Sequence, residues 1–137
     1  MSLTVKDNEI LLIYDSDKLT DRQALAYAKS LREYVVKERD IARDPLTETQ
    51  LKRVADRLGV AVSELVDRQS DAYQDKYQSS SISEDHLLIA LKNEPQLLRT
   101  PIAVYPDSAE FVEATTFVKK GMAPPDITAR SANPREK

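Results

Sequence analysis

The chain has 137 residues, which is enough for one domain with its own hydrophobic core and short for two. Its formal net charge is -3, with acids and bases mixed along the length, so bulk charge gives no reason to expect direct binding to nucleic acid. It contains no cysteine and one histidine, His86, which excludes disulfides, thiol nucleophiles and sulfur-ligated metals for this chain alone.

No apolar stretch is long enough to span a membrane, and the first residues lack the charged-then-apolar pattern of a signal segment. We therefore expect a cytoplasmic protein that does not associate with membranes, and a monomer. We expect no cofactor and no metal, because a lone histidine would need several carboxylates to complete a metal site.

The first elements predict a βαβ unit. Residues 10–13 form an unbroken apolar run, which is typical of a strand buried on both faces. After a polar connection, apolar residues recur at helical spacing and predict a helix over about 21–34, with Thr20 as its N-cap. Residues 36–41 predict a second strand with a solvated charge run, and the two strands should be parallel.

A helical segment follows, over about 47–98. Thr47 and Gln50 fit a capping box at the start of a helix, and Gly59 stands where a left-handed residue would end it. Residues 62–66 predict another short helix.

Residues 69–81 are rich in Ser, Asp and Gln and predict a surface loop, in which Tyr73 and Tyr77 should lie over the domain's own core. Ser83 can cap a helix over 84–93, whose first turn should leave His86 facing solvent.

The last elements predict a β-hairpin. Residues 102–105 form an apolar strand that follows a proline, and 110–112 should pair with it in antiparallel fashion. Residues 115–120 favour a last short helix, and 122–137 show no periodicity and predict a disordered tail. We expect residues 1–121 to form a single domain.

These elements follow the order of a thioredoxin-like mixed sheet with a helical insertion, and separated motifs resemble the arsenate reductase (ArsC) and Spx family. The matching stretches are Ile13-Tyr14, Asp44-Pro45-Leu46-Thr47, Ala55-Asp56-Arg57-Leu58-Gly59-Val60, Ser83-Glu84-Asp85-His86-Leu87-Leu88-Ile89-Ala90-Leu91, Asn93-Glu94-Pro95 and Leu97-Leu98-Arg99-Thr100-Pro101-Ile102-Ala103-Val104. The resemblance covers roughly residues 10–104. It implies an α/β, thioredoxin-like fold with an ArsC-type insertion, and a cis peptide bond between Thr100 and Pro101.

The sequence departs from this family where the family's chemistry lies. The place of the reductases' nucleophilic cysteine falls at Lys18 or Leu19, and neither side chain can form a thiolate or a mixed disulfide. We therefore expect no thiol-based reductase activity.

The arginines that the resemblance implies are only partly present. Arg22 matches the one that follows the cysteine, and Glu48 reverses the charge of a second. Thr100 replaces a third, with Arg99 one position earlier.

A loop that leads from a strand to a helix N-terminus often binds ligands, because free N–H groups and the helix dipole point outward there. Two functional hypotheses follow. The first is a non-enzymatic protein-interaction or regulatory module, for which the resemblance to Spx-type regulators suggests RNA polymerase as a partner. The second is a degenerate binding module for a small anion or a thiol ligand such as glutathione, or a protein that is arsenate reductase-like by name only.

The candidate site residues are Lys18, Leu19, Thr20, Arg22, Arg99, Thr100 and Pro101. A third interpretation gives the loop no function: it is an ordinary strand-to-helix connection, in which Leu19 covers the core of its own domain instead of entering a pocket of a partner. The last hypothesis is an enzyme whose chemistry does not use a thiol. We rank it lowest because the sequence shows no set of acid, base and nucleophile for such chemistry.

Overall fold

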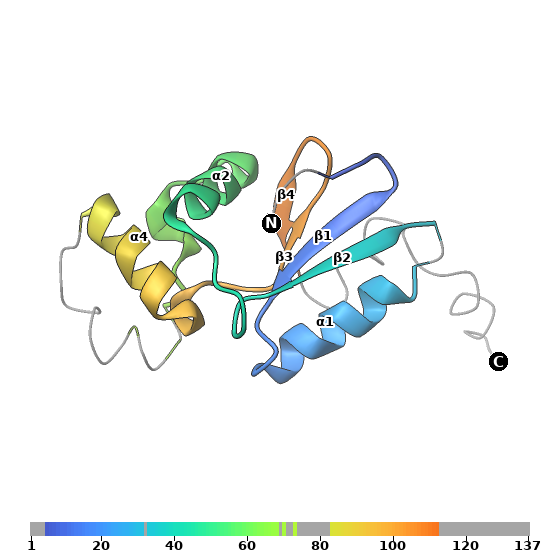
Figure 1. The fold of residues 1–137 in the computed structure, drawn as a ribbon, viewed down its shortest axis with the longest axis horizontal. Helices are drawn as coiled ribbons and strands as arrows, with labels where there is room; N and C mark the ends of the chain where they lie inside the picture. Colours follow the sequence, from blue (N-terminus) through green and yellow to red (C-terminus); the bar gives the residue numbers. More distant parts are fainter. Residues whose placement is uncertain (1–4, 32, 69, 71–72, 74–82, 113–137) are drawn as a thin grey trace.

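A computed structural model of the chain describes residues 5–31, 33–68, 70, 73 and 83–112 (Figure 1). Within these residues one mixed sheet has the strand order β2-β1-β3-β4. Its strands are β1 (Glu9–Tyr14), β2 (Val35–Asp40), β3 (Ile102–Val104) and β4 (Ala109–Phe111). β1 pairs in parallel with β2 and antiparallel with β3, and β3 and β4 form an antiparallel hairpin. The predicted βαβ unit and hairpin are confirmed.

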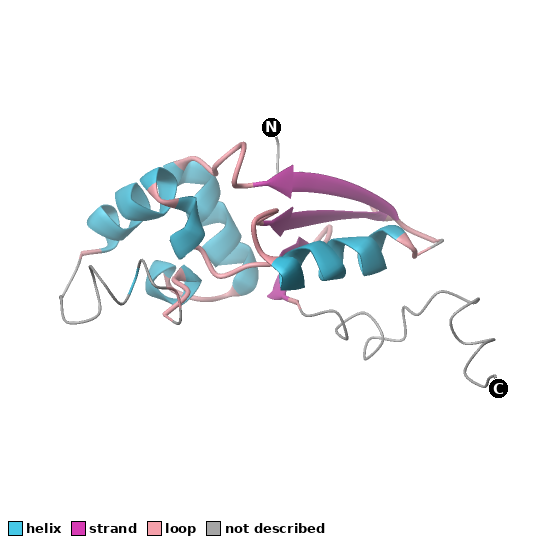
Figure 2. Cartoon of the chain, turned by 90° about the horizontal axis from the view of Figure 1, so that it is seen from below, coloured by secondary structure: helices cyan, strands magenta, loops and turns pink. Residues whose placement is uncertain are grey.

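The helices divide between one face of the sheet and one end of it. They are α1 (Leu19–Lys29), α2 (Glu48–Leu58), the 3-10 turn η1 (Val62–Leu65), α4 (Glu84–Asn93) and the 3-10 turn η2 (Pro95–Leu97). α1 lies along one face, and α2 and α4 lie at the end of the sheet where α1 begins (Figures 1 and 2). No helix of the described residues is long and apolar enough to cross a membrane.

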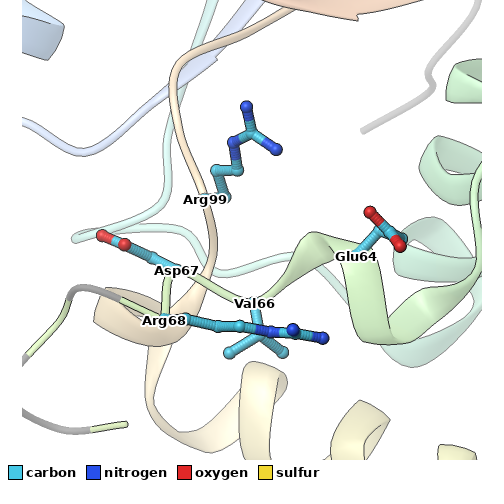
Figure 3. Close-up of a pocket in the computed structure, with 5 residues that line it drawn as sticks. All are labelled: Glu64, Val66, Asp67, Arg68 and Arg99. Carbon is cyan, nitrogen blue, oxygen red and sulfur yellow. The ribbon is translucent and has the colours of Figure 1, made fainter. Parts of the chain in front are cut away.

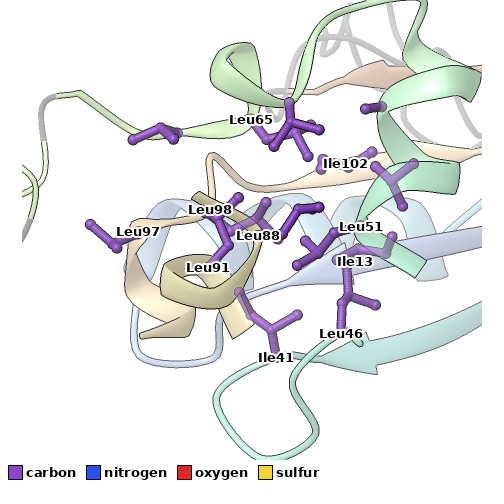
Figure 4. Packing of buried hydrophobic residues seen from close by; sticks show 14 of the residues in the cluster. Ile13, Ile41, Leu46, Leu51, Leu65, Leu88, Leu91, Leu97, Leu98 and Ile102 are labelled. Carbon is purple, nitrogen blue, oxygen red and sulfur yellow. The ribbon is translucent and has the colours of Figure 1, made fainter. Parts of the chain in front are cut away.

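The central strand β1 is buried on both faces, as its apolar run predicts. Leu11 and Ile13 belong to the core that α2, η1, α4 and η2 complete, and Figure 4 shows Ile13 among the leucines of these helices. Ile10 and Leu12 belong to a second core beneath α1. Since alternate residues of a strand point to opposite faces, β1 joins the two cores.

The ends of α2 are set by local sequence, and both predictions there are confirmed. The backbone N–H of Gln50 donates to Thr47 Oγ1 at 3.1 Å, and the backbone N–H of Thr47 donates to Gln50 Oε1 at 3.1 Å. Gly59 ends the helix at a φ of 73°, a conformation that costs glycine little. Ser83 also caps α4, and His86 is exposed, as predicted.

The predicted bounds of α1 are wrong at both ends. The helix begins at Leu19, two residues early, and its N-cap is Lys18, without a side-chain cap; Thr20 is already helical. It ends at Lys29, well before residue 34. The chain must leave the helix early because Val35 already belongs to β2, where it pairs with Glu9 of β1.

The charge run of β2 is only partly solvated, which corrects a second expectation. Arg39 is 4% exposed, and its guanidinium donates to the carbonyl oxygens of Asp44 at 2.8 Å and Pro45 at 2.9 Å. It also donates to Gln50 Oε1 at 3.2 Å, so a β2 side chain fixes the connection into α2. Nε and Nη2 of this buried arginine are paired in this way, whereas Nη1 is buried without a hydrogen bond.

Tyr73 packs against the core, as predicted. Most of the predicted surface loop, including Tyr77, lies outside the described residues, and so do the predicted helix over 115–120 and the predicted tail over 122–137. The extent of the predicted domain, 1–121, stays a prediction.

The buried position of β1 gives a first prediction. Replacing Ile13, which is 0% exposed, with alanine should lower the free energy of unfolding by about 2–5 kcal/mol, because it leaves a cavity between β1 and the helices. The control is Ile89→Ala, since Ile89 is 45% exposed and its loss should change stability by about 0.5 kcal/mol or less. Urea unfolding followed by circular dichroism measures both, and equal effects would contradict the packing described.

Candidate functional site

The first loop, residues 15–18, connects β1 to α1 and lies beside the segment that leads into β3. The peptide bond between Thr100 and Pro101 is cis, as the resemblance implies. Lys18 Nζ of the loop donates to the carbonyl oxygen of Leu98 at 3.4 Å. The structure therefore brings the loop next to the residues that precede the cis proline.

The backbone donors of this loop are already used by the chain itself. Each N–H from residue 15 to residue 18 has an acceptor, and three of these acceptors are carboxylate oxygens. They are Asp21 Oδ2 for Asp15 (2.9 Å), Asp40 Oδ1 for Ser16 (3.1 Å), Asp15 Oδ1 for Asp17 (2.9 Å) and the Asp15 carbonyl for Lys18 (3.0 Å). An oxyanion at this loop would meet occupied donors and carboxylate charge rather than a free cradle of N–H groups.

The predicted cations of the site point to different partners. Arg22 Nη1 donates to the Ser16 carbonyl at 2.7 Å, on the loop's own backbone. Lys18 Nζ lies 3.6 Å from Asp67 Oδ2. The guanidinium carbon of Arg99 lies 4.0 Å from the centre of the Phe111 ring. Within the described residues, Lys18, Arg22 and Arg99 therefore each have a contact of their own.

Leu19 and Thr20 stand at the exposed start of α1. Leu19 is 60% exposed, so it does not cover its own core, which corrects that expectation. Thr20 is exposed as well, whereas Pro101 is buried. Glu48, the charge-reversed position, lies on α2 with Oε2 3.8 Å from Lys92 Nζ.

Asp21 is a buried carboxyl beneath the loop, and it is not among the candidate site residues from the sequence. It is 1% exposed. Its Oδ2 accepts the Asp15 N–H, while its Oδ1 and the hydroxyl of Thr100 are buried without a hydrogen bond. Burial raises the pKa of Asp21, and the nearby Thr100 hydroxyl, the Asp15 N–H and the charge of Lys18 partly oppose this rise.

A cavity of about 400 Å³ adjoins the loop. Its walls are formed by Glu64, Val66, Asp67, Arg68 and Arg99. Figure 3 shows Arg99 reaching it from the segment before β3, and the other four residues coming from η1 and the stretch that follows. Sequence reasoning found only Arg99 of this set, because residues 64–68 carry no motif that points to a site.

No group of three or more side chains that could hold a metal ion occurs in the part of the chain that the structure describes. Asp21, whose Oδ1 is buried without a hydrogen bond, is enclosed by the protein. The arrangement therefore offers exposed apolar and cationic side chains around a loop whose backbone N–H groups are bonded within the chain.

The buried carboxyl predicts a pH-dependent effect. Because the folded pKa of Asp21 is raised, the folded state binds its proton more tightly than the unfolded state, and stability should fall as pH rises through that raised pKa. Asp21→Asn keeps an acceptor for the Asp15 N–H without the charge, so it should be more stable than wild type at pH 7 and lose that advantage near pH 4. Urea unfolding at several pH values measures this, with the exposed Asp56→Asn as control; an advantage independent of pH would contradict it.

Known proteins resemble this chain in structure rather than in sequence. No protein-family model and no curated protein matches the sequence. A candidate arsenate reductase from Yersinia pestis shares 18% identity at a TM-score of 0.71, over 80% of this chain and 98% of that one. An arsenate reductase from Vibrio cholerae shares 19% identity at a TM-score of 0.68, over 77% and 91%.

A third solved structure, described as ArsC family related and from Bacteroides fragilis, shares 18% identity at a TM-score of 0.66, over 85% of this chain and 99% of that one. Identities this low establish the fold and leave the activity open. The chain therefore has the thioredoxin-like α/β fold of the arsenate reductase (ArsC) structures, and it has that fold without any cysteine.

Proposed function

We propose that this chain is a non-enzymatic protein-interaction module that binds a partner protein through the face around its first loop. Leu19 carries the proposal. It is 60% exposed at the start of α1, and the resemblance places the family's cysteine at Lys18 or Leu19. An apolar side chain held on a helix, next to an internally bonded loop, is suited to enter an apolar pocket of a partner.

The internal bonding of the loop favours protein binding over ligand chemistry. All four N–H groups of the loop already donate to acceptors within the chain, so the loop has few free donors for an oxyanion. The negative charges of Asp15 and Asp21 would also repel an oxyanion. The same bonds hold the loop in one shape. A rigid surface loses less conformational freedom on binding, which favours association with a protein.

The resemblance to Spx-type regulators makes RNA polymerase the first partner to test. Arg22 and Lys18 flank Leu19 and would lie at the polar rim of such an interface. The alternative, a binding module for a small anion or a thiol ligand, uses the same loop, so one titration separates the two.

Purified protein should reduce arsenate no faster than buffer in the presence of glutathione and glutaredoxin, because no thiolate is available. Titration of ¹⁵N-labelled protein with inorganic phosphate or glutathione should also leave the amide signals of residues 15–18 in place. Measured turnover would overturn the non-enzymatic proposal, and saturable shifts of those amides would favour the alternative.

Leu19→Asp should reduce partner recovery at least tenfold in affinity capture from the native extract, since a central apolar anchor contributes about 2 kcal/mol or more. Aspartate at the first helical position suits the helix dipole, so the fold should be kept, as circular dichroism can verify.

Ile89→Asp is the matched control, because Ile89 is also an exposed apolar residue but lies on α4. Recovery of RNA polymerase subunits by the wild type and the control, but not by Leu19→Asp, supports the regulatory module. Equal recovery by all three proteins would refute the role of Leu19.

A further inference from the structure

We infer that Asp21 and Thr100 form a proton-controlled clamp that holds the first loop against the segment leading into β3. This inference rests on the proposed function and adds a form of regulation, because Leu19 directly follows the loop. Asp21 is 1% exposed, and the hydroxyl oxygen of Thr100 is buried. Both residues would therefore act through the loop, as positioning residues, and not by contact with a partner.

Two buried polar atoms lie at this junction. Asp21 Oδ2 accepts the Asp15 N–H at 2.9 Å, but Asp21 Oδ1 and Thr100 Oγ1 have no hydrogen bond. The Thr100 hydroxyl nevertheless lies close enough to lower the pKa of Asp21. Because buried polar atoms in proteins are nearly always paired, a small rotation that lets the hydroxyl donate to Oδ1 would satisfy both atoms at once. The carboxyl would then be bonded to the loop on one side and to the segment before the cis proline on the other.

Burial makes the clamp sensitive to protons. Desolvation disfavours the charged carboxylate and raises the pKa of Asp21 in the closed structure. A loop that opens exposes Asp21 to water, where a carboxyl has its ordinary pKa. The closed form thus binds the proton more tightly than the open form. Closure is therefore favoured as the pH falls through the raised pKa, and it weakens as the pH rises through it.

Two charged groups of the loop act on Asp21 directly. Lys18 lowers the pKa of Asp21, and Asp15 raises it. Lys18 Nζ also donates to the Leu98 carbonyl at 3.4 Å, so it bridges the same two segments as the proposed clamp. It lies 3.6 Å from Asp67 Oδ2 as well, so Asp21 shares this cation with a second carboxylate.

Other charged groups come from the elements packed around the junction. Asp40 of β2 accepts the Ser16 N–H at 3.1 Å, and Arg22 of α1 donates to the Ser16 carbonyl at 2.7 Å. Arg99, next to Thr100 in the chain, lies with its guanidinium carbon 4.0 Å from the centre of the Phe111 ring. These groups support the loop and the segment on either side, and the ionisation of Asp21 changes the charge between them.

A chain of bonds connects the clamp to Leu19. Asp21 Oδ2 holds the Asp15 backbone, and the Asp15 carbonyl accepts the N–H of Lys18 at 3.0 Å. Lys18 is the N-cap of α1 and directly precedes Leu19. A closed clamp therefore keeps Leu19 in the position described, and an open clamp releases the residues that hold it.

The pair can be tested by ¹³C nuclear magnetic resonance of the full chain, in which the carboxyl signal of Asp21 reports its pKa. Thr100→Val removes the hydroxyl, so the pKa of Asp21 should rise above its wild-type value because the carboxylate loses a donor. Thr49→Val is the control, since Thr49 is exposed on α2 and its loss should leave the pKa in place. An Asp21 pKa that stays the same or falls in Thr100→Val would overturn the pair.

Amide hydrogen exchange tests whether the pair controls the loop. After correction for the intrinsic rate, protection of the Asp15 amide should fall as the pH rises through the measured pKa of Asp21, and Asp21→Asn should remove this dependence. The Asp15 amide should also be less protected than the amide of Ile41, which is 1% exposed and donates to the Tyr14 carbonyl at 2.8 Å.

Two results of the exchange experiment would contradict the clamp. Equal protection of the Asp15 and Ile41 amides would mean that the loop opens only when the whole domain unfolds. Protection of the Asp15 amide that does not vary with pH would mean that the ionisation of Asp21 does not control the loop.

Partner capture separates this inference from the proposed function. The ratio of partner recovered by the wild type to that recovered by Asp21→Asn should be higher below the pKa of Asp21 than above it; the ratio removes any pH dependence of the partner itself. If capture depends on Leu19 but this ratio does not change with pH, the inference fails and the proposed function stands. If the Asp15 amide responds to the ionisation of Asp21 but capture does not depend on Leu19, the proposed function fails and the clamp is a property of the free protein.

Discussion

The burial of β1 on both faces is the constraint on which the rest of the structure depends. Leu11 and Ile13 need the helices of the insertion to exclude water, and Ile10 and Leu12 need α1. Apolar burial on this scale is the main favourable contribution to folding, so the strand fixes where both sets of helices must pack. This packing also sets the position of the first loop, because the loop follows β1 at the end of the sheet where α1 begins and the helices of the insertion lie.

The loop itself is held by carboxylates. Asp15, Asp21 and Asp40 accept three of its backbone N–H groups, and these bonds replace the free donors that a strand-to-helix connection otherwise presents. A buried carboxylate is costly unless its oxygens are bonded, and one oxygen of Asp21 is not. The unbonded oxygen of Asp21 therefore costs stability, while all four N–H groups of the loop have acceptors within the chain.

The fold of the arsenate reductase structures is therefore present here in a chain without cysteine. The resemblance places the family's cysteine at Lys18 or Leu19; Lys18 is bonded to the chain, and Leu19 is exposed. Arg99, two residues before the cis proline, is stacked on Phe111 beside a cavity, and Arg22 donates to the backbone of the loop. These exposed apolar and cationic groups are the features from which we propose an interaction surface.

The sequence by itself determined the strands, the capping box of Thr47 and Gln50, the αL turn at Gly59 and the absence of a thiol, because each depends on neighbouring residues or on composition. It also indicated the fold, through motifs in a specific order. Only the tertiary structure decided that Asp21 and Arg39 are buried, that Leu19 is exposed, and that residues 64–68 meet Arg99. These features depend on contacts between residues far apart in the chain, where packing and desolvation outweigh local preference.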